Sequence, residues 1–243
     1  MKSFVFGGIS ILMGTSVYAE TIPVNANSDR YFIELYSYGY EEPSLMTKDS
    51  EIAFFSLGWQ DYGMAGSDGF IGNARYFYGT TEYASTSTGT TSGDPTSGVQ
   101  AELAHKWSMT DYDLFAGLGY RRLFDDWGGK VSSTNNWTYD RRSEYFYAPI
   151  GILNHIEGGG YFKGQFNYLI EGTQTSYLSD GGSYSDVTST QNSGYGLELE
   201  YSPQSNYAVF LRYWDINDGT VESRYSTYEP NNTTTELGFK WLF

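Results

Sequence analysis

The chain holds two histidines, His105 and His155, which are the first candidates for acid–base chemistry. A catalytic base needs a group that orients it or a nucleophile that it activates. Neither histidine has an Asp two residues away or a Ser at an obvious spacing. The acidic pair Asp125 and Asp126 has no histidine within reach in the arrangement of strands predicted below. We therefore expect no catalytic site.

Acidic residues cluster in three segments that could offer oxygen ligands to a metal ion. These segments contain Glu41 and Glu42, Asp125 and Asp126, and the stretch Asp215–Asp218. The last of them, within DINDGT, has the Asp, Asn and Gly of a calcium loop but lacks its full ligand spacing and closing Glu. The chain has no cysteine, so it offers no thiolate ligand and no disulfide. We expect no metal and no cofactor.

Strands must position these residues, because apolar and polar side chains alternate over long stretches. In Tyr195–Tyr201, two Tyr and two Leu alternate with Gly and two Glu, so one face of the strand is apolar. We predict an antiparallel up-and-down β-barrel of about ten strands, with eight as the alternative. The predicted strands are Arg30–Tyr40, Glu51–Asp61, Gly69–Thr81, Gly98–Met109, Asp111–Phe124, Arg141–Ile156, Tyr161–Thr173, Ser193–Tyr201, Asn206–Ile216 and Thr233–Phe243.

The connectors between these strands alternate between long and short. The long ones are rich in Ser, Thr, Gly, Asp and Asn, and we predict them as loops: Glu41–Ser50, Glu82–Ser97, Asp125–Asp140, Gln174–Asn192 and Asn217–Asn232. The short ones are predicted turns: Tyr62–Asp68, Thr110, Glu157–Gly160 and Ser202–Ser205. Long extracellular loops and short periplasmic turns are typical of outer-membrane barrels, and this alternation places both termini in the periplasm.

Strand parity places a set of charged side chains on the inward, polar faces. They are Glu34, Arg75, Glu102, Lys106, Arg121, Lys163, Glu171, Glu198, Glu200, Arg212, Glu236 and Lys240. Acids and bases are equal in number, and buried charges of opposite sign pair because an isolated one is costly. Bulky Phe77, Phe115, Phe210 and Trp214 share these faces. We expect a narrow lumen filled by salt bridges. The facing of 145–153 stays open, because both of its faces are apolar.

The first residues and the composition indicate export. Lys2, the apolar run Phe4–Met13 and small residues at Val17 and Ala19 are typical of a secretory signal over 1–19, followed by one barrel domain over 20–243. No later stretch is apolar enough for a transmembrane helix, and mean hydropathy is −0.45. The net charge of −15 excludes nucleic-acid binding through phosphates. The abundant Tyr, Phe and Trp suit aromatic girdles at two bilayer interfaces.

The last stretch, TTTELGFKWLF, carries a family resemblance. Leu237, Phe239, Trp241 and Phe243 form an apolar face, and this ending resembles the assembly signal of bacterial outer-membrane barrels. The chain resembles the small members of that class, the size range of OmpA-type barrels, Opc-type adhesins and omptins. The resemblance implies a bacterial outer-membrane location, contact with its lipids, insertion by the outer-membrane assembly machinery acting on the last strand, and loops that face outward. An extracellular ligand at these loops is a candidate partner.

Three functions are compatible with these observations. We predict a structural or adhesin-like surface barrel with acidic, Ser/Thr-rich loops and a filled lumen. The first alternative is a small, narrow porin for ions or small solutes. The second is a surface enzyme of the omptin or acyl-hydrolase type, for which the sequence offers no convincing catalytic group.

Overall fold

The computed structural model describes residues 29–182, 184–221 and 229–243, so the predicted signal at 1–19 lies outside it. The chain forms β1 (Asp29–Glu42), β2 (Met46–Ser50), β3 (Phe54–Asp61), β4 (Gly69–Ser85), β5 (Gly89–Ser108), β6 (Asp113–Asp125), β7 (Arg141–Ile156), β8 (Gly160–Ser176), the 3-10 helix η1 (Leu178–Gly181), β9 (Val187–Gln191), β10 (Gly194–Gln204), β11 (Tyr207–Ile216), β12 (Thr220–Val221) and β13 (Asn232–Leu242). Within the described ranges, no helix has the length and apolar character to cross a membrane.

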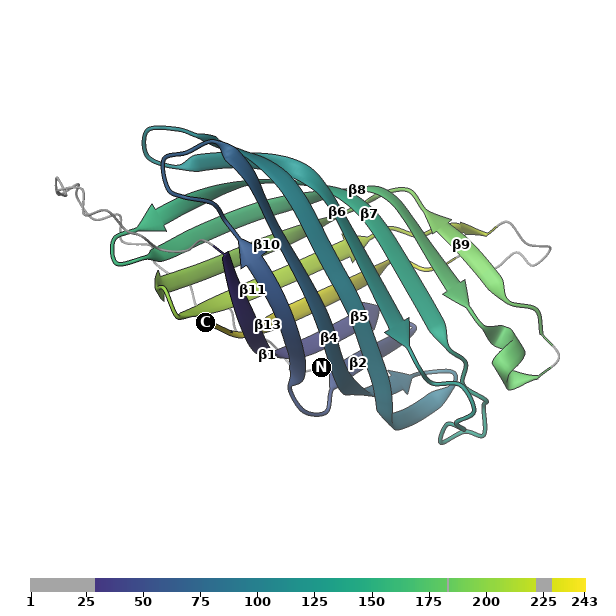
Figure 1. Cartoon of the computed structure of the whole chain (residues 1–243). Helices are drawn as coiled ribbons and strands as arrows, with labels where there is room; N and C mark the ends of the chain where they lie inside the picture. Colours follow the sequence, from purple (N-terminus) through teal and green to yellow (C-terminus); the bar gives the residue numbers. More distant parts are fainter. Residues whose placement is uncertain (1–28, 183, 222–228) are drawn as a thin grey trace.

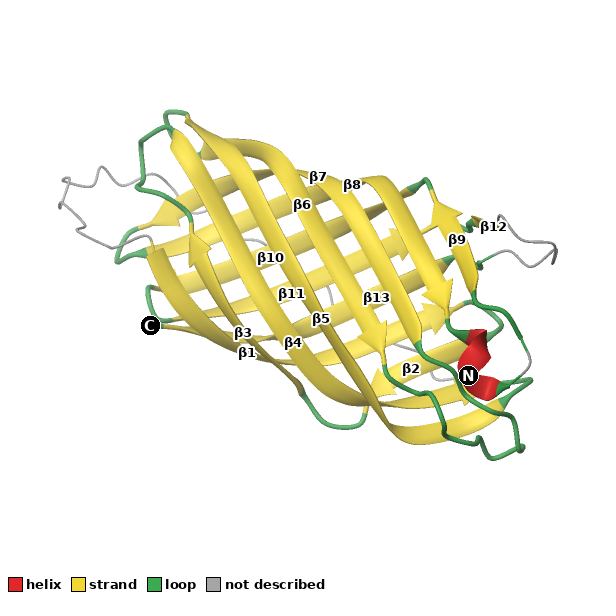
Figure 2. Cartoon of the chain, turned by 45° about the vertical axis from the view of Figure 1, so that its right-hand side comes forward, coloured by secondary structure: helices red, strands yellow, loops and turns green. Residues whose placement is uncertain are grey.

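Antiparallel pairing runs from strand to strand until the sheet closes on itself (Figures 1 and 2). The seam is formed by β1 and β13, which pair from Phe32 with Leu242 to Glu41 with Thr233. β2 and β3 occupy one position in the barrel, because both pair with β1 and with β4. β9 and β10 likewise both pair with β8. The predicted antiparallel barrel of about ten strands is confirmed.

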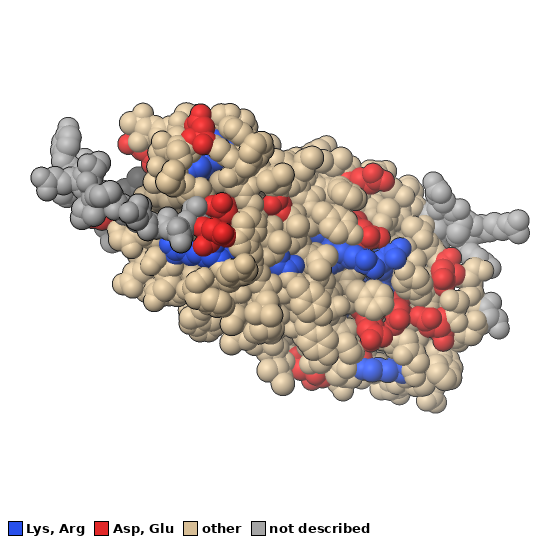
Figure 3. All heavy atoms as spheres, in the orientation of Figure 1, with Lys and Arg blue, Asp and Glu red and all other residues tan. Residues whose placement is uncertain are grey.

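The wall of the barrel separates apolar from polar side chains. Outward residues such as Phe70 and Leu118 are exposed, whereas inward residues such as Gln60 and Lys163 are buried. On the face in Figure 3 most of the wall carries neither acids nor bases, and most Asp and Glu lie toward the two ends. A closed sheet satisfies its own backbone hydrogen bonds, and an apolar exterior around a polar interior is the arrangement that a bilayer requires.

The segment 145–153, whose facing the sequence left open, follows the same alternation. Tyr145, Tyr147 and Leu153 point inward and are buried, whereas Phe146 and Ile150 point outward and are more than half exposed.

Inward glycines make room for the large rings in the narrow lumen. A Cβ atom on Gly119 would lie 2.3 Å from the ring of Tyr147.

Several strands continue beyond their predicted ends, so part of the loop prediction was wrong. The predicted loop Glu82–Ser97 is a hairpin in which β4 runs to Ser85 and β5 starts at Gly89. The predicted loops Glu41–Ser50 and Gln174–Asn192 are likewise shortened by β1 and β2 and by β8 and β9. Threonine is β-branched and favours strands, so a Ser/Thr-rich composition did not indicate loops here. Residues 222–228 of the predicted loop Asn217–Asn232 lie outside the described ranges.

A β-bulge corrects the predicted facing of Glu171. The pairing of β7 with β8 shifts so that Phe146 faces Glu171 while Tyr147 faces Leu169. The extra residue, Ile170, reverses the parity of the rest of β8, because each added residue turns the next side chain to the other face. Leu169, before the bulge, is buried inside as its parity requires, whereas Glu171, after the bulge, is exposed outside.

Candidate functional site

The centre of the lumen is a network of buried ion pairs. Arg212 lies 2.6 Å from Glu34, 3.3 Å from Glu236 and 3.4 Å from Glu198. Arg75 of β4 contacts Glu34 and Glu236, at 3.4 and 2.8 Å. Arg121 of β6 contacts Glu236 of β13, on the far side of the closed sheet, at 3.2 Å. These side chains come from strands far apart in the sequence, and each is nearly inaccessible to solvent. The network therefore links opposite walls across the bore.

Apart from Glu171, the charges predicted to face inward lie inside the barrel. Glu34, Arg75, Glu102, Lys106, Arg121, Lys163, Glu198, Glu200, Arg212, Glu236 and Lys240 are all buried. The sequence did not place a second group, of which four members lie in predicted loops while Asp113 and Arg141 lie at or near the starts of predicted strands. Glu42, Lys48, Asp94, Asp113, Asp125 and Arg141 are buried too. Among the described residues the buried set contains nine acids and eight bases, so the interior is close to neutral.

Aromatic layers flank the charge network and fill the remaining bore. Toward the end formed by the connections of β1–β2, β4–β5, β6–β7 and β8–β9, here called the loop end, Phe54, Phe77 and Trp214 are fully buried. Toward the opposite turn end, Phe32 and Phe115 pack in a second cluster. Two cavities between the charge network and the turn-end cluster measure about 10 Å³ each. Such a volume holds a single water molecule.

The two histidines lie near the turn end, in different settings. His105 lies on the outer wall, where its ring contacts Phe70 and Trp107. The Nε2 atom of His155 lies 3.3 Å from an Asp113 carboxylate oxygen, and Lys106 also contacts that carboxylate, at 2.7 Å. The sequence did not reveal this pair, because its members meet only through the pairing of β6 with β7.

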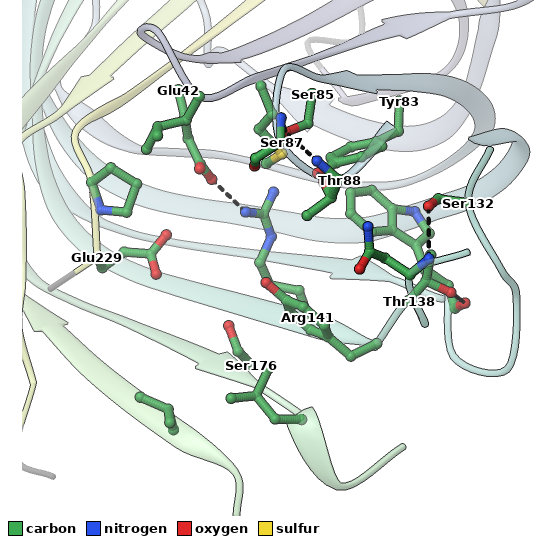
Figure 4. A pocket seen from close by; sticks show the side chains of 18 of the residues that line it. Glu42, Tyr83, Ser85, Ser87, Thr88, Ser132, Thr138, Arg141, Ser176 and Glu229 are labelled. Carbon is green, nitrogen blue, oxygen red and sulfur yellow. Dashed lines mark hydrogen bonds and ion pairs between the residues drawn. The ribbon is translucent and has the colours of Figure 1, made fainter. Parts of the chain in front are cut away.

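A pocket of about 340 Å³ opens at the loop end, and we call it the mouth pocket. It is lined by aromatic, apolar, hydroxyl and amide side chains together with Glu42, Arg141 and Glu229. Figure 4 shows Arg141 reaching between the two carboxylates, with an ion pair to Glu42. Trp127 and Trp137 also line it, both from the connection of β6 to β7.

The floor of the mouth pocket is a second ion-pair cluster. Arg141 contacts Glu42 at 2.6 Å and Asp125 at 3.2 Å. Lys48 bonds to the same Asp125 carboxylate and lies 4.5 Å from the centre of the Trp127 ring. Asp125 was predicted to begin the loop Asp125–Asp140, but it is the last residue of β6. It is buried and neutralised by two cations.

Glu229 is the acid of the pocket that has no cation bonded to it in the described part of the chain. It accepts a hydrogen bond from the amide of Gln174. Burial raises the pKa of Glu229 to about 7, an effect that Glu42 reinforces and Arg141 opposes. Glu229 interacts electrostatically with five other titratable groups: Arg141, Glu42, Tyr40, Tyr139 and Tyr145.

No protein-family model and no curated protein matches the chain. Among solved structures it is similar to the outer membrane protease OmpT from Escherichia coli, with 13% identity, 88% of this chain and 96% of that one covered, and a TM-score of 0.46. It is similar to Ail, the attachment invasion locus protein of Yersinia pestis, with 12% identity, coverages of 88% and 97%, and a TM-score of 0.37. It is also similar to the translocator domain of the autotransporter NalP from Neisseria meningitidis, with 10% identity, 89% of each chain covered, and a TM-score of 0.41.

The closed barrel, its apolar wall and its polar interior settle the class. The chain has the fold of a bacterial outer-membrane β-barrel. The solved structures have low identities and TM-scores, so no residue role passes from them to this barrel. The assembly role expected for Leu237, Phe239, Trp241 and Phe243 stays a prediction. These residues lie on the outer wall and are exposed.

Proposed function

We propose that this barrel is a sealed outer-membrane protein that presents its loop end to the cell exterior as a binding surface. The observation that carries the proposal is the filled lumen, in which the ion pair of Arg121 with Glu236 spans the bore between aromatic layers. Interior width grows with strand number, and about eight strands leave room only for side chains. Ten strands lie close to that limit. A solute therefore has no continuous path through the barrel as it stands.

Binding at the loop end is the role that this arrangement favours. The mouth pocket has a volume within the range of small-ligand sites, about 300–1,000 Å³. We propose a binding role rather than a catalytic one, because the pairing of His155 with Asp113 lies at the turn end, away from the pocket. Insertion by the outer-membrane assembly machinery, acting on β13, is part of the same proposal.

We expect the purified protein to give no steady current in planar lipid bilayers. The paired Arg and Glu side chains and the large rings leave cavities of about 10 Å³, too small for a hydrated ion to pass. The measurement is single-channel recording at neutral pH, with a porin as the positive control for insertion. Insertion itself is checked by protease protection of the reconstituted barrel. A large and stable ion-selective conductance would contradict the sealed lumen and favour the narrow porin.

A further inference from the structure

Trp137 is a large aromatic side chain that lines the mouth pocket. It lies in the connection between β6 and β7 rather than on the lipid-facing wall, yet it is 61% exposed. A large exposed aromatic residue beside a pocket is typical of a contact surface, because burying it on binding is favourable. The face of its ring carries partial negative charge, which attracts the polarised C–H groups of a ligand.

The polar groups around Trp137 are mostly uncharged and act both as donors and as acceptors. Ser85, Ser87, Thr88 and Asn136 line the same pocket. Hydroxyl and amide groups of this kind suit a ligand whose own groups also donate and accept, which is the chemistry of a sugar hydroxyl. Figure 4 shows Ser85, Ser87 and Thr88 gathered on one side of the pocket.

The cation of the pocket is already paired, and Glu229, the acid without a bonded cation in the described part of the chain, accepts a hydrogen bond from Gln174. Arg141 is the cation among the lining residues, and both Glu42 and Asp125 hold it. An anionic ligand would have to displace one of these carboxylates, on a chain whose net charge is −15. A cationic ligand would lie near Arg141 and Lys48, and Lys48 already occupies a face of Trp127. An uncharged ligand meets neither penalty.

The segment that carries Trp137 is held in place before any ligand arrives. At its start, the backbone N–H groups of Trp127 and Gly128 donate to the Asp140 carboxylate, at 2.8 and 2.6 Å. At its tip, the Ser133 backbone N–H donates to the Thr90 carbonyl of the β4–β5 hairpin at 3.0 Å. Ordering a binding segment in advance lowers the entropy cost of association.

We infer that the mouth pocket binds an uncharged carbohydrate, with a sugar ring stacked on Trp137 and its hydroxyl groups bonded to the surrounding Ser, Thr and Asn side chains. The pocket of about 340 Å³ accommodates a short segment of such a chain. The inference rests on the proposed function, because the pocket meets external carbohydrate only if the loop end faces outward.

The test measures binding of neutral oligosaccharides to the full-length barrel in lipid nanodiscs. The probes are maltose, cellobiose and chitobiose oligomers, and the readouts are calorimetry and tryptophan fluorescence. We expect saturable binding by at least one series, and a Trp137→Ala variant should bind it about ten-fold more weakly because the stacking surface is gone. Trp137 is exposed, so this variant should fold. The matched control is Tyr184→Ala, which removes another exposed ring from the β8–β9 connection, outside the lining of the pocket.

Charged probes and pH separate this ligand class from its rivals. Chitosan oligomers test cationic ligands and heparin fragments test anionic ones. Binding of a neutral sugar should change little between pH 6 and 8, whereas a cation should bind more tightly as Glu229 loses its proton. Binding that depends on Trp137 but is restricted to a charged probe would overturn the inference while leaving the loop end as a binding surface. Failure of every probe would also overturn it. A steady conductance would instead overturn the sealed barrel.

Discussion

Replacing Arg212 by alanine should destabilise the folded barrel by about 3 kcal/mol, at the lower end of the range for breaking a buried ion pair. The Arg212 side chain is 4% exposed and contacts three carboxylates. Its removal leaves Glu34, Glu198 and Glu236 with less positive charge around them in a medium that solvates ions poorly. Arg75, Arg121 and Lys163 remain nearby, and this keeps the expected loss moderate.

The measurement is equilibrium unfolding in urea with the barrel inserted in lipid vesicles. Arg142→Ala is the matched control, because the Arg142 side chain is one-third exposed and pairs with Glu144 outside the lumen. Such exposed pairs contribute about 0–1 kcal/mol. Adding Glu34→Gln to the Arg212→Ala variant should restore part of the lost stability by removing an excess negative charge. Equal unfolding midpoints for Arg212→Ala and the unmodified protein would show that the network does not hold the barrel together.

Replacing Glu229 by glutamine should stabilise the barrel at neutral and alkaline pH but not in acid. The pKa of Glu229 is about 7 in the folded chain, against an ordinary value of 4.5. Between these values the unfolded chain has lost the proton that the folded chain keeps, so the stability of the unmodified protein falls as pH rises through this window. This difference in pKa corresponds to a loss of stability of at most about 3 kcal/mol above pH 7. Water that enters the pocket makes the loss smaller. The variant has no such proton to lose.

Urea unfolding of both proteins from pH 4.5 to 8 tests this expectation. The stability difference should be close to zero at the acid end, grow through the window and level off above pH 7. Glu157→Gln is the control, since Glu157 is exposed in the turn between β7 and β8. A difference that stays constant across the range would mean that the Glu229 carboxyl titrates as it does in water.

Alternation within strands was enough to predict most of the barrel and its charged interior. In β10, Glu198 and Glu200 alternate with Leu and Tyr, and both point inward as their parity requires. Local sequence carries that information because successive side chains in a strand point to opposite faces. Parity fails where a residue is inserted. Nothing in the sequence around Ile170 indicates the bulge, so the predicted facing of Glu171 was wrong.

The mouth pocket could not be predicted in the same way, because no single segment contains it. Its floor joins Glu42 of β1 to Arg141 of β7, which are 99 residues apart. The strand extensions that bring these residues together look like loops in composition. The arrangement of Lys48, Asp125 and Arg141 similarly depends on strands that meet only when the barrel closes. One signal was present in the sequence: Trp127 and Trp137 are two tryptophans in a segment otherwise rich in small and polar residues.

The length of the strands determines how far the mouth pocket stands from the membrane. β5 has 20 residues, and at about 3.3 Å per residue and a tilt of about 40° it rises roughly 50 Å along the barrel axis. The apolar band of such barrels is only about 25 Å tall, so roughly half of this height projects beyond the hydrocarbon. The exposed apolar residues of β5, Val99, Leu103 and Trp107, lie in its second half, so the part that projects is the loop end with its pocket. A polymer excluded from the headgroup layer by its size still diffuses past the opening, and capture does not require it to approach the lipid.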